Sequence, residues 1–235
     1  MNDFYSPVQN ISLWFGAWLY GHVSFDELHA SLLELDGPHM LDDAPEHLVD
    51  LAKIVRTHAP IGHEVPALTF LFGGAGQSLG PSIGSQHAIL LGSSTVLVPH
   101  AIPDGMIWQH REYPLPYPGI LLPGEADLQL AEAARRAARL IDTAIPSHEV
   151  RVDPRLKVGT LHDHYDIPGL PAATPARSVK LLARANRLSA IVETVLNHYG
   201  QHRYDPVLLE LAMAVRQARM SAVHYAVAEW GRLAG

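Results

Sequence analysis

The C-terminal stretch of the chain decides the fold, because it predicts two long helices that form a hairpin. Residues 176–199 read ARSVKLLARANRLSAIVETVLNHY, and residues 205–232 read DPVLLELAMAVRQARMSAVHYAVAEWGR. Apolar residues recur in both at spacings of three and four, which is typical of helices with one buried face. Gly200 suits the end of the first helix, and Asp205 and Pro206 suit the N-cap and first position of the second.

The second of these helices carries more apolar surface than one partner helix can cover. One seam, from Leu208 to Tyr225, faces the hairpin partner. A second apolar set lies off that seam and consists of Leu209, Met213, Met220 and Val227. An exposed apolar patch of this kind usually marks an interface. We therefore predict a homodimer built on residues 176–232, with this second set at the interface.

Three short helices are predicted in residues 1–58. The first covers Pro7 to Tyr20, and the second begins where Ser24 and Glu27 form an S-x-x-E capping box. The third runs from about Asp43 to Thr57. The sequence thus begins with a helical region rather than with strands.

Residues 60–124 hold nine of the eighteen prolines and ten of the eighteen glycines, which excludes long helices there. Short apolar runs predict the strands of a small, mostly antiparallel sheet, at Ala67–Phe72, Ala88–Leu91, Thr95–Val98 and Met106–His110. A helix is predicted over residues 125–144, with its apolar face at Leu128, Ala131, Ala138 and Ile141. The predicted fold is α+β: a body of residues 1–174, with an irregular connector at 146–174, and the long helical hairpin of residues 175–235.

Composition and charge narrow the class of protein. The absence of cysteine excludes disulfides and thiolate chemistry and agrees with a reducing compartment. No apolar run reaches the ~18 residues of a membrane span, so we expect a cytoplasmic protein without a membrane partner. Residues 1–174 carry 9 Lys/Arg and 20 Asp/Glu, whereas residues 175–235 carry 8 and 4. This acidic body makes nucleic acid an improbable partner.

The basic residues of the hairpin leave a weaker alternative open, a nucleic-acid-associated regulator. Its cations would be Arg177, Lys180, Arg184 and Arg187. Binding of this kind weakens steeply with salt. The simpler interpretation is that these side chains form the solvated face of the helix.

A glycine-rich loop is the first candidate ligand site. Residues 73–80 read GGAGQSLG and follow a predicted strand, so Gly73, Gly74 and Gly76 could cradle a phosphate. Pro81 follows the loop, and the sequence predicts no helix opening on it. The alternative interpretation is a turn between strands.

A second candidate is a possible divalent-metal site at His162, His164 and Asp166. In an extended segment these side chains project to one face, and two imidazoles with a carboxylate suit zinc or iron. The segment locally resembles the H-x-H-x-D-H motif of metallo-β-lactamase-fold hydrolases, with Ile167 in place of the final histidine. That resemblance implies a metal-dependent hydrolase; polar residues of a surface loop are the alternative.

The sequence therefore favours a noncatalytic protein whose C-terminal hairpin mediates self-association or partner binding. A metal-dependent hydrolase is the alternative, with the glycine loop shaping its substrate pocket. The chain contains fifteen histidines, several near the predicted strands, but no G-x-S-x-G motif that would single out a nucleophile. No catalytic residue and no small-molecule ligand follow from the sequence.

Overall fold

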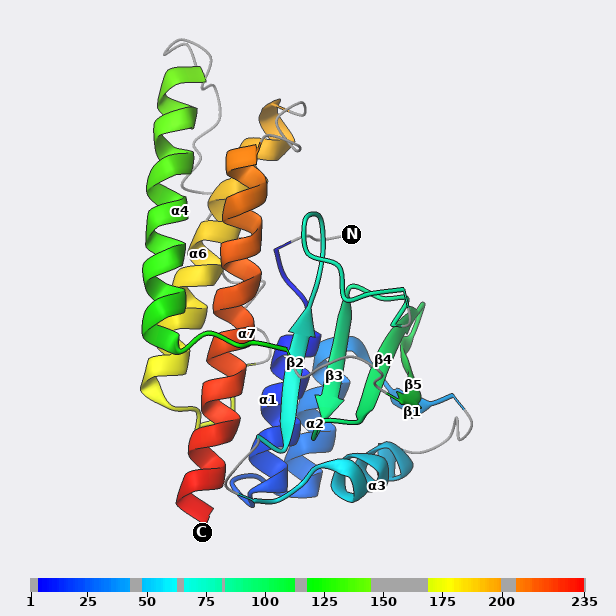
Figure 1. The fold of residues 1–235 in the computed structure, drawn as a ribbon. Helices are drawn as coiled ribbons and strands as arrows, with labels where there is room; N and C mark the ends of the chain where they lie inside the picture. The colour runs from blue at the N-terminus through cyan, green and yellow to red at the C-terminus, as the bar shows by residue number, and fades with distance from the viewer. Residues whose placement is uncertain are drawn as a thin grey trace.

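The chain folds into a five-stranded sheet with helices packed on it and with long helices along one side (Figure 1). The computed structural model describes residues 4–42, 48–62, 66–81, 83–112, 118–144, 169–199 and 206–234, with the backbone alone at 140–144 and 194–199. Helices come first along the chain, then most of the sheet, then the long helices. This order confirms the predicted α+β class.

The N-terminal region contains α1 (Val8–Leu19), α2 (Phe25–Asp36), β1 (His39–Leu41) and α3 (Leu48–His58). The predicted capping box is present at the start of α2. The N–H of Glu27 donates to Ser24 Oγ at 3.2 Å, and the N–H of Ser24 donates to Glu27 Oε2 at 2.7 Å. The predicted start of α3 near Asp43 lies outside the described residues.

The sheet has the order β1-β5-β4-β3-β2, with β2 (Leu68–Phe72), β3 (His87–Leu91), β4 (Thr95–Ile102) and β5 (Gly105–Glu112). The last four strands pair antiparallel, as predicted. The short edge strand β1 was not predicted, and it pairs parallel with β5. Its three residues carry no strand pattern of their own, so this strand depends on its neighbour.

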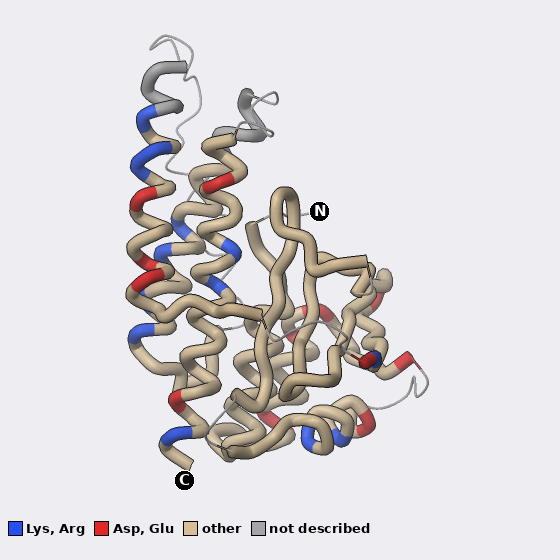
Figure 2. Tube along the Cα trace, viewed as in Figure 1, with Lys and Arg blue, Asp and Glu red and all other residues tan. Residues whose placement is uncertain are grey.

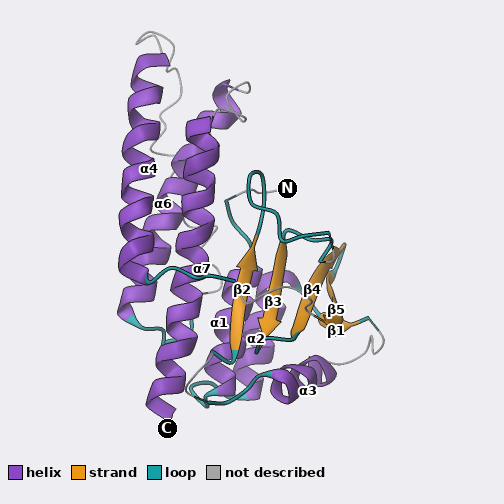
Figure 3. Cartoon of the chain, viewed as in Figure 1, coloured by secondary structure: helices purple, strands orange, loops and turns teal. Residues whose placement is uncertain are grey.

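The two faces of the sheet differ in what covers them. Phe70, Leu97 and Trp108 belong to the main core, which α1, α2, α3 and α7 share. The opposite face carries a smaller apolar cluster that includes Leu90 and Val96. Figure 3 shows α1 and α2 together on one side of the sheet. The main core therefore lies between the sheet and the helices.

The long helices are α4 (Pro123–Ala144), α6 (Ala176–Tyr199) and α7 (Pro206–Ala234). The predicted helices of the C-terminal hairpin are confirmed, but α4 packs against both of them and makes a three-helix bundle. The predicted apolar face of α4 is wrong in part, because Leu128 is 57% exposed and Ala138 is exposed. Small residues such as Ala133 are buried instead, and α4 packs against α7. None of the helices in the described ranges has an apolar stretch long enough to cross a bilayer.

A buried arginine of α7 ties the bundle to the N-terminal region. The guanidinium of Arg219 donates to Phe4 O at 2.7 Å, Gln9 Oε1 at 2.7 Å and Asn186 Oδ1 at 2.6 Å. Its side chain has no exposed surface. These bonds join α7 to α6, to α1 and to the segment before α1, so this arginine is a core residue and not part of a solvated face.

Candidate functional site

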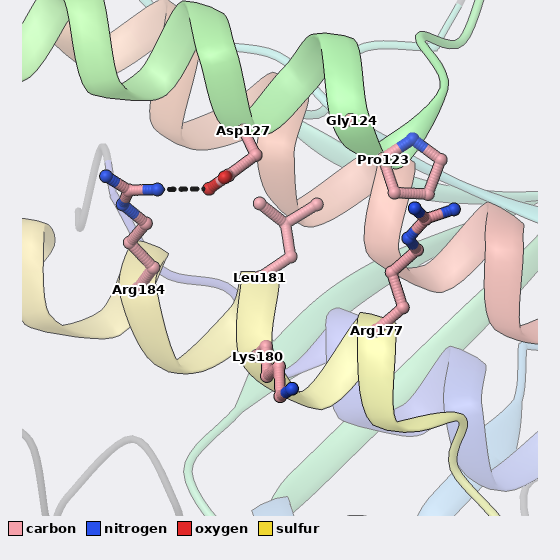
Figure 4. Close-up of a pocket in the computed structure, with 7 residues that line it drawn as sticks. All are labelled: Pro123, Gly124, Asp127, Arg177, Lys180, Leu181 and Arg184. Carbon is pink, nitrogen blue, oxygen red and sulfur yellow. Dashed lines mark hydrogen bonds and ion pairs between the residues drawn. The ribbon is translucent and has the colours of Figure 1, made fainter.

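A groove lies between the first turns of α4 and α6, and Figure 4 shows the residues around it. Its volume is about 410 Å³. The lining residues are Pro123, Gly124, Asp127, Arg177, Lys180, Leu181 and Arg184. The helices α4 and α6 run in the same direction, so their N-terminal ends lie at the same end of the bundle (Figure 1). The groove is thus built where two helix N-termini meet.

The electrostatic character of this groove is positive. A helix N-terminus carries a partial charge of about +0.5. The first turn of α6 contains no acidic residue; it contains Arg177, and Lys180 follows directly. The first turn of α4 contains Glu125, whose Oε2 accepts the N–H of Leu122 at 3.2 Å. The start of α6 therefore combines the positive end of a dipole with cationic side chains.

One ion pair fixes the two helices relative to each other. Arg184 Nη1 lies 2.6 Å from Asp127 Oδ1, and both side chains are 46% exposed. Arg177 lies on the other side of Leu181, beside Pro123 (Figure 4). Its guanidinium carbon is 5.9 Å from the centre of the Tyr225 ring. The groove thus has three cations and one carboxylate over an apolar floor.

Lysine and arginine are concentrated on the C-terminal bundle (Figure 2). Residues 1–122 contain only Lys53, Arg56 and Arg111. The sequence singled out all three groove cations, together with Arg187, which does not line the groove. It could not show that the start of α4 lies beside them, because no local pattern links residues so far apart in the chain.

A second groove, of about 600 Å³, lies between α4 and α7. Its lining includes Met213, Leu121 and Gln77 of the glycine-rich loop. Arg136 Nε donates to Glu210 Oε2 at 3.0 Å and links the two helices there. Met213 is 39% exposed. The glycine loop and part of the predicted interface therefore meet at this groove.

The predicted interface set divides into two pairs. Met220 is buried, and its sulfur accepts the N–H of Phe72 on β2 at 3.3 Å. Val227 is also buried, against Gly16 of α1, where a Cβ atom would lie 3.0 Å from Val227 Cγ2. The body of the protein covers these two residues, which corrects the predicted set. Leu209, half-buried, and Met213, exposed, keep surface that a second copy could reach.

The glycine loop forms a tight turn that lies against α7. The N–H groups of Gly73 and Gly74 already donate to Gln86 O and Gln77 O, each at 2.7 Å. A Cβ at Gly74 would lie 2.8 Å from Arg216 Nη1, and one at Gly76, where φ is +75°, would lie 3.2 Å from Met213 Sδ. These close approaches explain the glycines without a phosphate. In the described part of residues 73–86 no helix opens on the loop.

The candidate metal ligands His162, His164 and Asp166 lie outside the described residues. Within the ranges that the structure describes, no three His, Asp or Glu side chains are grouped so as to hold a metal ion. The possible divalent metal stays a prediction from the sequence.

The fold and the groove define an α+β protein with a sheet-containing N-terminal region, a C-terminal helical bundle and a cationic site on that bundle. One family model, for the N-terminal domain of Rv1486c-like protein, matches residues 9–120, and another, for the C-terminal domain, matches residues 124–220. The chain therefore belongs to the Rv1486c-like family. No curated protein and no solved structure matches it. The boundary between the two matched ranges falls near the start of α4, so the C-terminal model includes α4 together with the hairpin. The boundary expected from the sequence lies after residue 174 instead.

Proposed function

We propose that the protein is a noncatalytic binding protein whose C-terminal helices bind a compact, phosphate-bearing anion in the groove between α4 and α6. One observation carries this proposal: Arg177 stands in the first turn of α6, where the helix dipole disfavours a cation, and Lys180 follows that turn beside the groove. Residues that break a local stability rule are expected mainly at functional sites.

The chemistry of the groove suits a phosphate group. The planar guanidinium of Arg177 can donate two parallel hydrogen bonds, and the ammonium of Lys180 supplies a mobile point charge. The first N–H groups of a helix have no intrahelical acceptor, so those of α4 and α6 add donors. The lining residues supply cations and an apolar floor rather than a nucleophile next to a base. This composition supports binding over catalysis.

Calorimetric titration with inorganic pyrophosphate tests the proposal. The variant Arg177→Gln/Lys180→Gln should bind about tenfold or more weakly, since a hydrogen bond to a charged group contributes about 1.5–3 kcal/mol. Arg135→Gln is the matched control, because Arg135 is an exposed cation of α4 that does not line the groove. Equal affinity in the groove variant and in the wild type would overturn the proposal.

Self-association of the hairpin is a second proposal, supported by the exposure of Met213 beside half-buried Leu209. Met213→Glu should convert a sedimenting dimer into a folded monomer, because a carboxylate in an apolar contact is strongly unfavourable. Met220 is unsuitable for this test because it is buried within the chain. A wild-type protein that sediments as a monomer would contradict this proposal.

The metal-dependent hydrolase stays an alternative that elemental analysis can test. Stoichiometric zinc or iron in the purified protein, lost on changing His162 and His164 to Ala, would support it. Protein that contains no metal after purification in the presence of zinc or iron would contradict the hydrolase alternative.

A further inference from the structure

Two histidines from distant parts of the chain meet at one end of the sheet. His58 is the last residue of α3, and His110 lies on β5. Their ring centres are 4.8 Å apart, with an angle of 46° between the ring planes. His58 is half-buried and His110 is exposed, so water reaches the pair. The arrangement lies far along the chain from the candidate groove and depends on none of its residues.

The surroundings of His58 fix the orientation of its ring. Thr95 of β4 is buried, and its Oγ1 lies 3.2 Å from His58 Nδ1. In the tautomer of His58 whose Nδ1–H donates to this hydroxyl, the other ring nitrogen, Nε2, has its lone pair free. A metal ion can bind Nε2 in this tautomer.

The electrostatic setting favours a cation at the pair. His58 lies in the last turn of α3, where the helix carries a negative partial charge. Glu112 is two residues beyond His110 on β5, so both side chains project to the same face, and Glu112 is also the register partner of Thr95. Arg111 projects to the opposite face, where its Nη1 donates to Ile83 O at 3.3 Å.

We propose that His58 and His110 form a two-histidine site for a transition metal ion such as Zn²⁺ or Ni²⁺. Neutral imidazole is a preferred ligand of these ions. Because no third protein ligand is grouped with the pair among the described residues, water completes the coordination shell. The site is thus open and binds its ion reversibly.

Calorimetric titration of the full chain with Zn²⁺ and with Ni²⁺ tests the site. The protein should carry His162→Ala and His164→Ala, so that the other candidate site contributes nothing. A single saturable binding event is expected, and either His58→Gln or His110→Gln should weaken it by about tenfold or more. His110 is exposed, so the His110→Gln variant should fold normally. Weaker binding by this variant therefore cannot be explained by misfolding.

Two further variants separate this site from nonspecific binding by the other histidines. His100→Gln is the matched control, because His100 is an exposed histidine of the neighbouring strand β4. Thr95→Val keeps the side-chain shape but removes the hydroxyl, so it should weaken binding through the ring of His58 by about tenfold. Equal loss in His100→Gln, or no loss in His110→Gln, would overturn the proposal.

Discussion

The first turns of α2 and α6 are built in opposite ways. The start of α2 has a complete capping box at Ser24 and carries Asp26 and Glu27, which the helix dipole favours. The start of α6 has no acidic residue and carries Arg177 at the entrance of a groove. The same local rules apply to both helices. Under the proposed function, the start of α2 serves the fold, whereas the start of α6 serves binding.

The largest expected effect comes from an arginine that serves the fold. Arg219→Met should lower the free energy of unfolding by about 3–5 kcal/mol, because it leaves buried acceptors without a donor. Those acceptors belong to Phe4, Gln9 and Asn186. Denaturant unfolding measures the change.

Arg177→Met is the matched control for the buried arginine. Arg177 is exposed, so its loss should change the free energy of unfolding by less than about 0.5 kcal/mol. Equal destabilisation by the two variants would remove the contrast between structural cations and groove cations.

The folded protein should also lose stability in acid through His39 of β1, which contacts α2. His39 Nε2 donates to Leu32 O of α2 at 3.1 Å, and His39 Nδ1 accepts the Trp108 Nε1–H at 3.0 Å. Burial lowers the pKa of His39 to about 4. Between pH ~6.5 and ~4 the unfolded chain binds a proton at this residue and the folded chain does not, so stability falls as pH falls.

Urea unfolding at several pH values between those limits measures this loss, which should reach about 1–3 kcal/mol for His39. Burial also lowers the pKa of His87 to about 4, so it contributes in the same direction. His39→Gln should reduce the slope. A stability that does not change over this pH range would show that neither histidine is buried as the structure has it.

A smaller effect is expected at the cap of α2. Ser24→Ala should lower the free energy of unfolding by about 1 kcal/mol, because the N–H of Glu27 loses its acceptor. Thermal unfolding detects a change of this size. Ser178 of α6 is the comparison, since its hydroxyl donates to Ala222 O and does not cap the helix. A Ser24→Ala variant as stable as the wild type would contradict the structural role of this turn.

Patterns within single segments were sufficient for most of the fold. The capping box at Ser24 and the residues around the hairpin predicted helix boundaries closely, because caps and periodicity are local. The edge strand β1 and the buried face of α4 were missed because both depend on partners distant in sequence. Likewise, Met220 reads as surplus apolar surface until β2 is placed against it.

The candidate site shows the same limit. The cations of α6 were visible in the sequence, but the groove requires the start of α4 beside them. The glycine loop was recognised, but its close contact with Arg216 of α7 required the structure. Long-range placement therefore decides what each local motif does.

The variant Arg177→Glu shows whether the start of α6 favours binding at the expense of stability. Unfolding and pyrophosphate titration should be measured on the same protein, with Arg135→Glu as the control. We expect the variant to be more stable than the wild type by about 0.5 kcal/mol, because a carboxylate then meets the positive end of the helix. Its affinity for pyrophosphate should fall about tenfold or more. A variant that loses stability and keeps its affinity would show that Arg177 stabilises the fold and does not bind the anion.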